Sequence, residues 1–243
     1  MRYVLLATTT ALVLATPTSA TAGTPGFVDV RLGSINIDPV ELTTAGIGGS
    51  VVAPLSGNWN VQVDGELTRF EFGDETVSGS ALVAHVFQDT GDWAVGALLG
   101  YQGFDAVSFW TLGAEAQYTV GAFVLEAGLG IGTGEAASDN VDTFSANASA
   151  TWYASADLSF TGGIYFLDLR DRVDVTDYSL DVEYRFAGSP FSVIGGYTFT
   201  DYENGNEGDA WSIGLRYAFG DSTLQARRNE GPRWLREDSA LVF

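Results

Sequence analysis

The stretch AWSIGLRYAFG, residues 210–220, decides the fold. Every second residue from Trp211 to Phe219 is bulky and apolar, and the residues between them are polar or small. A period of two places alternate side chains on opposite faces of a β-strand. One face of this strand is therefore apolar, and the other can face water.

The same alternation returns along most of the chain. In WNVQVDGEL, residues 59–67, tryptophan, valine and leucine side chains alternate with asparagine, glutamine, aspartate and glutamate. Comparable segments begin at Trp93, Trp110, Phe123, Phe144, Leu158, Tyr178 and Phe191, and weaker ones lie near 27–33, 45–53 and 80–88. This pattern predicts about twelve strands of roughly ten residues, the length of a tilted bilayer-spanning strand. The predicted fold class is all-β: a transmembrane antiparallel up-and-down β-barrel, with ten or eight strands as alternatives.

A secreted β-sandwich or a soluble barrel such as a lipocalin is the alternative fold. Such a protein would direct its bulky residues inward and its charges outward. In this chain the faces opposite the bulky residues are polar or tiny, as in Ser145, Asn147, Ser149 and Thr151. Aromatic residues stand at one or both ends of most strands, as the interfacial belts of membrane barrels require. The pattern therefore favours a barrel whose outer face meets lipid.

The chain divides into three parts. Residues 1–22 have a single arginine, an apolar run and a small-residue site, which are typical of a secretory signal peptide. Residues 23–220 hold the predicted barrel, and residues 221–243 form a tail with four of the eleven basic residues. No cysteine is present, so an exported chain of this size must be stable without disulfides. The formal net charge of −20 argues against a nucleic-acid partner.

The predicted turns fall into two classes. Those around 54–58, 89–92, 119–121, 154–157 and 187–190 are tight, whereas those around 73–78, 133–142, 168–176 and 201–209 are mostly longer and acidic. Residues 104–107 are a short exception in the second class. Outer-membrane barrels carry short turns on the periplasmic side and longer loops outside. We therefore expect both termini in the periplasm and an even number of strands.

The last strand carries a further signal. In a known family of proteins, the last strand carries an assembly signal. This strand matches it position for position, at Ser212, Gly214, Tyr217 and Phe219. The sequence thus resembles the small porin-like outer-membrane β-barrel proteins of Gram-negative bacteria. This resemblance implies location in the cell outer membrane, contact with its lipid and lipopolysaccharide, and insertion by the outer-membrane assembly machinery. It implies no particular solute. The second ending of the chain, at Phe243, lacks the glycine of the signal.

Charged residues on the small, polar faces should line the lumen. Because an unpaired buried charge is costly, we expect these carboxylates to pair with Arg31, Arg185 or Arg216, or else to meet water. Glu115 and Glu126 lie on strands joined by a tight turn and are expected to be cross-strand neighbours. The residues expected to face the lumen are Asp64, Glu66, His85, Glu115, Glu126, Asp181, Glu183, Arg185 and Arg216.

Three kinds of chemistry are alternatives to a purely structural role for these lumen residues. His85 is the sole histidine, so a Ser-His arrangement would have to use it, yet it should lie near the periplasmic end of its strand. Paired carboxylates could support acid/base catalysis, and a lumen network is the simpler interpretation. Residues 201–209 resemble a calcium loop but depart from its ligand pattern. We therefore expect no catalytic residue, no bound metal and no cofactor, and keep divalent cations bridging acidic loops to lipopolysaccharide as an alternative.

These observations predict a porin-like passive channel for small solutes, with a preference for cations because its lumen is acidic. A closed barrel with a structural or surface-interaction role, contacting lipopolysaccharide or other cells, is the second interpretation. An outer-membrane lipid-modifying enzyme is a distant third. Whether the tail plugs the pore or hangs free is left open by the sequence.

Overall fold

The computed structural model describes residues 24–73, 75–105, 107–136, 139–170, 173–220 and 223–234. The predicted signal peptide, 1–22, lies outside the described residues.

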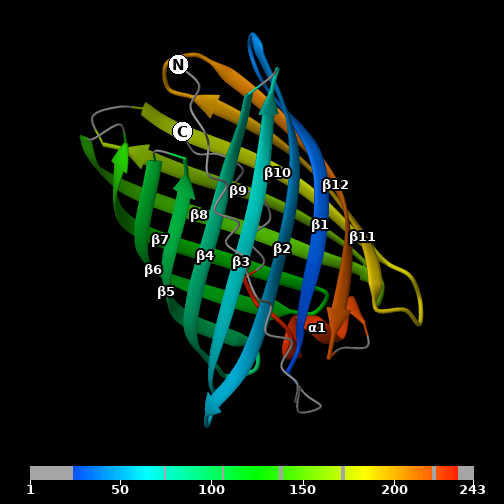
Figure 1. Ribbon diagram of the computed structural model, residues 1–243. Helices are drawn as coiled ribbons and strands as arrows, with labels where there is room; N and C mark the ends of the chain where they lie inside the picture. Colours follow the sequence, from blue (N-terminus) through cyan, green and yellow to red (C-terminus); the bar gives the residue numbers. More distant parts are fainter. Residues whose placement is uncertain are drawn as a thin grey trace, which may run out of the picture.

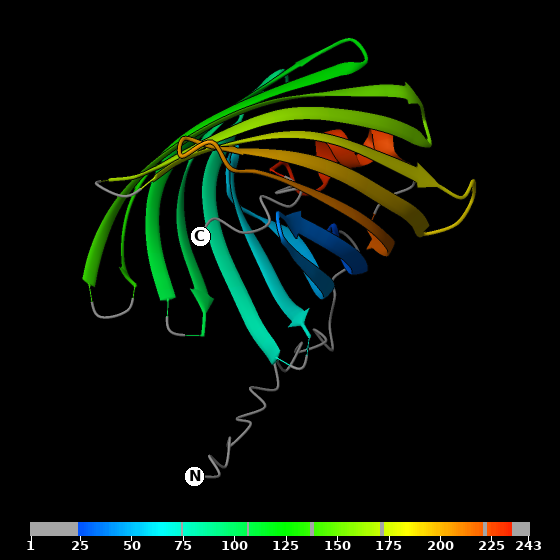
Figure 2. The same ribbon diagram turned by 90° about the horizontal axis from the view of Figure 1, so that it is seen from above.

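In this part of the chain, twelve antiparallel strands pair in sequence order and close into a barrel (Figures 1 and 2). Strand β1 (Gly26–Ile37) pairs with β2 on one side and with β12 (Glu207–Phe219) on the other. Closure leaves no unpaired strand edge. The predicted fold class and strand number are confirmed. The other strands are β2 (Val40–Ser56), β3 (Trp59–Phe72), β4 (Glu75–Asp89), β5 (Trp93–Phe104), β6 (Val107–Val120), β7 (Phe123–Ala136), β8 (Asp139–Ser155), β9 (Leu158–Leu169), β10 (Val173–Arg185) and β11 (Phe191–Tyr202).

The outer face of the barrel is apolar. Leu32, Leu112 and Leu180 each expose about 60% of their surface, although leucine is usually buried in soluble proteins. The alternation seen in the sequence produces this face, because each bulky residue points away from the lumen. An apolar band of this extent suits the hydrocarbon of a bilayer.

Aromatic side chains form two belts on this outer face. Near the end where β1 begins, Trp93 packs on Tyr118 with ring centroids 4.4 Å apart. Near the opposite end, Tyr101 and Trp110 form a similar pair at 5.0 Å. Aromatic rings prefer the polar boundary of a membrane, so two belts mark two interfaces. Phe191 with Tyr217 and Tyr178 with Phe199 are further ring pairs, one in each belt.

The strands are longer and the loops shorter than predicted. Strands run from 12 to 17 residues, whereas crossing a bilayer needs about 9–11. The segments predicted as long acidic loops are mostly strand, and the strand bounds leave two residues between β3 and β4 and four between β11 and β12. Backbone pairing continues past the apolar zone because polar side chains can extend a hairpin into water.

Gly26 and Phe219, the two ends of the barrel wall, pair with each other at one mouth, here called the terminal mouth. Tight turns join the strands there, and Gly57, Gly91, Gly121 and Gly188 adopt the positive φ that such turns require. The opposite opening is called the distal mouth.

A short helix, α1 (Leu224–Glu230), follows β12 at the terminal mouth (Figure 1). Thr223 caps its N-terminus, because Thr223 Oγ1 accepts a hydrogen bond of 2.9 Å from the backbone N–H of Ala226. Within the residues that the structure describes, no helix has the length and apolar character needed to cross a membrane.

Candidate functional site

The nine side chains expected in the lumen lie on the lumen face of their strands. Along each strand they alternate with the exposed apolar residues, so they point to the opposite side. Their burial differs: Arg216 exposes 1% of its surface, whereas Glu66 is exposed to the lumen. Their partners separate them into distinct groups. Two of these groups, around Arg216 and around His85, are buried networks.

Arg216 on β12 is the centre of the first network. Its Nε donates to Asp29 Oδ2 and its Nη1 to Glu183 Oε2, both at 2.9 Å. The guanidinium also lies over the ring of Phe27, 4.0 Å from the centroid. Two carboxylates thus flank one buried cation, which compensates for its desolvation. Asp29 was missed by the sequence analysis, although it alternates with Arg31 on β1 and lies opposite Arg216 in the closing register.

His85 on β4 is the centre of the second network. Its Nε2 lies 2.7 Å from Asp64 Oδ2, and its Nδ1 lies 2.8 Å from Glu115 Oε1. Asp64 also accepts hydrogen bonds from Ser50 and Gln62. Both imidazole nitrogens therefore contact carboxylates. Neither nitrogen is left to take a proton from a serine nucleophile, which a catalytic triad requires.

Glu115 and Glu126 are diagonal cross-strand neighbours and are not directly opposite each other. The register of β6 and β7 places Glu115 opposite Gly128 and Glu126 opposite Gln117. Gln117 donates to Glu126 at 2.6 Å. The two carboxylates are offset by two residues along the strands, and each has its own partner: His85 for Glu115 and Gln117 for Glu126.

Arg185 lies at the rim of the terminal mouth and does not join the lumen carboxylates as expected. Its Nε donates to Asp157 Oδ1 at 2.7 Å, and its Nη1 donates to the carbonyl of Ser189 at 2.9 Å. Both partners belong to turns, since the arginine is the last residue of β10. Arg185 therefore links the β8–β9 turn to the β10–β11 turn by hydrogen bonds.

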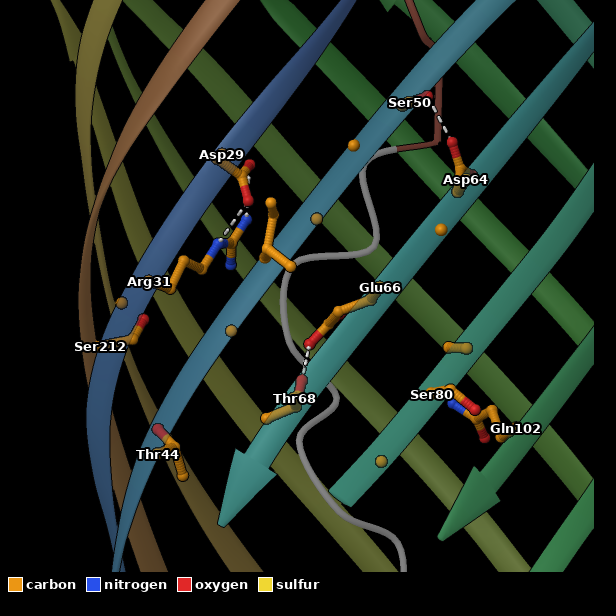
Figure 3. Close-up of a pocket in the computed structure, with 18 of the residues that line it drawn as sticks. Asp29, Arg31, Thr44, Ser50, Asp64, Glu66, Thr68, Ser80, Gln102 and Ser212 are labelled. Carbon is orange, nitrogen blue, oxygen red and sulfur yellow. Dashed lines mark hydrogen bonds and ion pairs between the residues drawn. The ribbon is translucent and has the colours of Figure 1, made fainter. Parts of the chain in front are cut away.

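The lumen toward the distal mouth holds a cavity of about 160 Å³ that water can occupy. Figure 3 shows side chains from β1, β2, β3 and β12 directed into this space. Arg31 lies beside Asp29, and Glu66 accepts a hydrogen bond from Thr68 at 2.5 Å. The charged residues that line the cavity are Asp29, Arg31, Asp64, Glu66, Asp181 and Arg216.

The segment of residues 223–234, here called the tail segment, lies at the terminal mouth on the inner side of the strands (Figure 2). Arg227 Nη2 donates to Glu183 Oε1 at 2.7 Å, and the Trp234 ring stacks on His85 at 5.6 Å between centroids. It therefore contacts both networks. The rest of the predicted tail, 221–222 and 235–243, lies outside the described residues.

Residues 201–209, which resemble a calcium loop in sequence, form the end of a β-hairpin. Asp201 lies directly opposite Glu207 in the pairing of β11 with β12, and Tyr202 N donates to Asn206 O at 3.1 Å in the intervening turn. Among the residues that the structure describes, no group of three or more His, Cys, Asp or Glu side chains is placed to hold a metal ion. Strand pairing spreads these carboxylates along a hairpin.

The assembly-signal residues occupy β12 as the alternation requires. Ser212 and Gly214 face the lumen, whereas Tyr217 and Phe219 lie on the outer face. A Cβ at Gly214 would lie 2.9 Å from Arg31 Cγ and 3.0 Å from Ile194 Cγ1, so the neighbouring strands use the space that this glycine leaves. Their part in assembly remains a prediction.

No model of a protein family matches the sequence, and no curated protein is significantly similar to it. Solved structures of outer-membrane barrels are similar in fold. An outer-membrane channel from Pseudomonas putida F1 matches with a TM-score of 0.62 and 12% identity, over 81% of this chain and 95% of that one. The translocator domain of the autotransporter NalP from Neisseria meningitidis matches with a TM-score of 0.57 and 12% identity, over 84% and 91%.

A third similar structure is the KdgM porin, solved in complex with disordered oligogalacturonate. It matches with a TM-score of 0.55 and 7% identity, over 79% of this chain and 99% of that one. Identities this low establish the architecture and not the solute. The chain has the fold of the outer-membrane β-barrels.

Proposed function

We propose that the protein is an integral outer-membrane barrel that lets small solutes diffuse passively, with a preference for cations. The observation that carries this proposal is a lumen cavity of about 160 Å³, large enough for water, with a charged lining. Among the described residues that line the cavity, four carboxylates face two guanidinium groups. A pore whose walls carry excess negative charge concentrates cations and repels anions. Similarity in fold to a porin and to an outer-membrane channel supports the proposal.

The terminal mouth faces the periplasm in this proposal, since the barrel wall begins and ends there. The protein acts without enzymatic chemistry. His85, the sole histidine, has carboxylates on both ring nitrogens, and its network is closed by Ser50 and Gln62 through Asp64. That arrangement stabilises the wall of a lumen and leaves neither imidazole nitrogen to act as the base for a serine nucleophile.

A closed barrel with a surface-interaction role is the second candidate. The tail segment supports it, because its side chains occupy part of the lumen at the terminal mouth. In that case the acidic distal hairpins would contact lipopolysaccharide or other cells, with divalent cations between the two anionic surfaces.

Single-channel recording of the refolded protein in planar bilayers separates the two candidates. We expect discrete conductance steps and, in a salt gradient, a reversal potential of the sign that cation preference gives. Repeated insertions without steps above baseline would rule out the channel and favour the closed barrel.

The charged lining is tested by two variants on one strand. Glu66→Gln removes a carboxylate that lines the cavity, whereas Glu71→Gln removes an outward carboxylate paired with Arg69 at 2.8 Å. Glu66→Gln should reduce cation preference and Glu71→Gln should leave it unchanged. Equal reversal potentials for both variants would show that the cavity lining does not set the selectivity.

A further inference from the structure

The tail segment makes contacts at two separated places on the barrel wall. The first place is formed by β10 and the neighbouring turns. Arg227 Nη2 donates to Glu183 Oε1 at 2.7 Å, and Leu224 N donates to the carbonyl of Ala156 at 3.0 Å. Leu224 exposes 2% of its surface. One end of the tail segment is thus fixed by an ion pair, a backbone hydrogen bond and a buried leucine.

The second place is formed by β3, β4 and β6. Arg233 N donates to Gln62 Oε1 at 2.7 Å, and Arg233 Nη1 donates to Gln117 Oε1 at 2.9 Å. The two glutamine amides return hydrogen bonds to the backbone carbonyls of Trp234 and Arg233, at 3.2 and 3.3 Å. Arg233 also pairs with Asp89 at the rim. Each glutamine therefore both accepts from and donates to this part of the tail segment.

Trp234 is the apolar part of this second anchor. Its ring stacks on His85 with an interplanar angle of 4°, and it meets Phe87 edge to face at 4.6 Å. Val52 and Ala94 complete a buried cluster around it. The tryptophan thereby covers the Asp64–His85–Glu115 network from the lumen side.

The two anchors lie on opposite walls. In a closed ring of twelve strands, β4 and β10 are six strands apart, which is half the circumference. The tail segment therefore spans the terminal mouth, and between the two anchors Arg228 Nη1 donates to the carbonyl of Gly121 in the β6–β7 turn. It also brings the guanidinium groups of Arg227, Arg228 and Arg233 into a mouth whose facing carboxylates include Glu183 and Asp89.

We infer that the tail segment is a resident plug, which crosses the terminal mouth, narrows the path for solutes and offsets its negative charge. The part of this inference that concerns conduction rests on the proposed channel function. Its anchors are mostly polar and ionic, and the apolar cluster at Trp234 is small. Two buried donors, Arg227 Nη1 and Trp234 Nε1, have no hydrogen-bond partner within the described residues. Both donors would regain water when the segment leaves, which favours a plug that can be displaced.

The position of the plug can be tested without any measurement of transport, because the chain has no cysteine. Ala94 exposes 1% of its surface and lies in the cluster that Trp234 completes. Ala94→Cys should react slowly with a water-soluble thiol reagent in the full chain. In a chain truncated after Gly220 it should react about tenfold faster or more, as expected when a buried thiol gains access to solvent.

Thr44→Cys is the control for this labelling experiment. Thr44 on β2 lines the cavity toward the distal mouth (Figure 3), whereas the two anchors of the tail segment lie at the terminal mouth. Its cysteine should react at similar rates in the full and truncated chains. If truncation does not change the reactivity of Ala94→Cys, the tail segment is not seated where we place it, and the inference fails.

Conductance and selectivity test what the plug does. The truncated chain should conduct about twofold more or better and prefer cations more strongly, because truncation widens the path and removes four arginines, three of them in the tail segment. Arg233→Ala with Trp234→Ala, which keeps the full chain, should change both quantities in the same direction. Arg69→Ala, on the outer face, is the matched control.

The outcomes separate the plug from the channel. Faster labelling of Ala94→Cys together with unchanged conductance in a conducting protein would overturn the restricting role of the tail segment. Faster labelling of Ala94→Cys in the truncated chain, with no conductance from any variant, would support the position of the tail segment in the terminal mouth. The same result would overturn the proposed channel function.

Discussion

Arg216→Ala should destabilise the barrel strongly. Arg216 exposes 1% of its surface and pairs with Asp29 and Glu183 at 2.8–2.9 Å, so its removal leaves two buried carboxylates beside an empty space. Breaking a buried ion pair typically costs about 3–5 kcal/mol. Each carboxylate keeps one other arginine: Asp29 keeps Arg31 at 3.4 Å, and Glu183 keeps Arg227 at 2.7 Å. We therefore expect the low end, a loss of about 3 kcal/mol or roughly a hundredfold in the unfolding equilibrium.

The assay is urea unfolding of the folded protein in detergent, followed by tryptophan fluorescence. Arg170→Ala is the matched control, because this arginine lies in the β9–β10 turn and is exposed. Adding Asp29→Asn to Arg216→Ala should recover part of the loss, since it removes one of the stranded charges. Equal unfolding midpoints for Arg216→Ala and Arg170→Ala would refute the buried network.

Three further predictions concern the closed barrel, the His85 network and Gly214. Unboiled and boiled protein should migrate differently in detergent electrophoresis, because a closed barrel resists unfolding; identical migration would count against the fold. His85→Ala leaves Asp64 and Glu115 without the group between them and should lower the urea midpoint, whereas His85→Gln should lower it less because it can still donate. Gly214→Val would bring a side chain against Arg31 and should reduce the fraction that refolds, measured as the heat-modifiable band.

The strands could be predicted from the sequence because the outer face requires apolar residues at a period of two. The strand ends could not be predicted in this way. In β7 the segment GTGEA, residues 132–136, carries no apolar alternation, yet it continues to pair with β6 and β8. Hydrogen bonds between backbones extend a hairpin regardless of side-chain polarity, so the pattern ends before the strand does.

The sequence could predict whether a charged side chain points into the lumen or outward, but it could not predict which residue that side chain contacts. Parity within one strand places Arg216 and Asp29 in the lumen. Their contact spans 187 positions in the sequence and depends on how the first strand meets the last. His85 and Glu115 lie on β4 and β6, which are separated by β5, so their contact depends on the curvature of the wall.

The position of the tail segment inside the barrel could not be predicted, for a different reason. Its apolar residues Leu224 and Trp234 are isolated and follow no period. Trp234 contacts residues of β2, β3, β4 and β5, and Leu224 contacts the β8–β9 turn, all of them far from the tail segment in the sequence. The excess of arginine at the end of an acidic chain was the only signal of a destination inside the barrel.

The attachment of the tail segment to β12 has a thermodynamic consequence. Four residues separate the end of β12 at Phe219 from Leu224, so the segment is an intramolecular ligand for the mouth. A short connection corresponds to an effective concentration of about 1 mM. A free peptide that bound the same anchors with a Kd of only about 10 μM would therefore, once attached, occupy the mouth about 99% of the time. Modest affinity is enough to keep the mouth filled, and a perturbation of a few kilocalories per mole is enough to empty it.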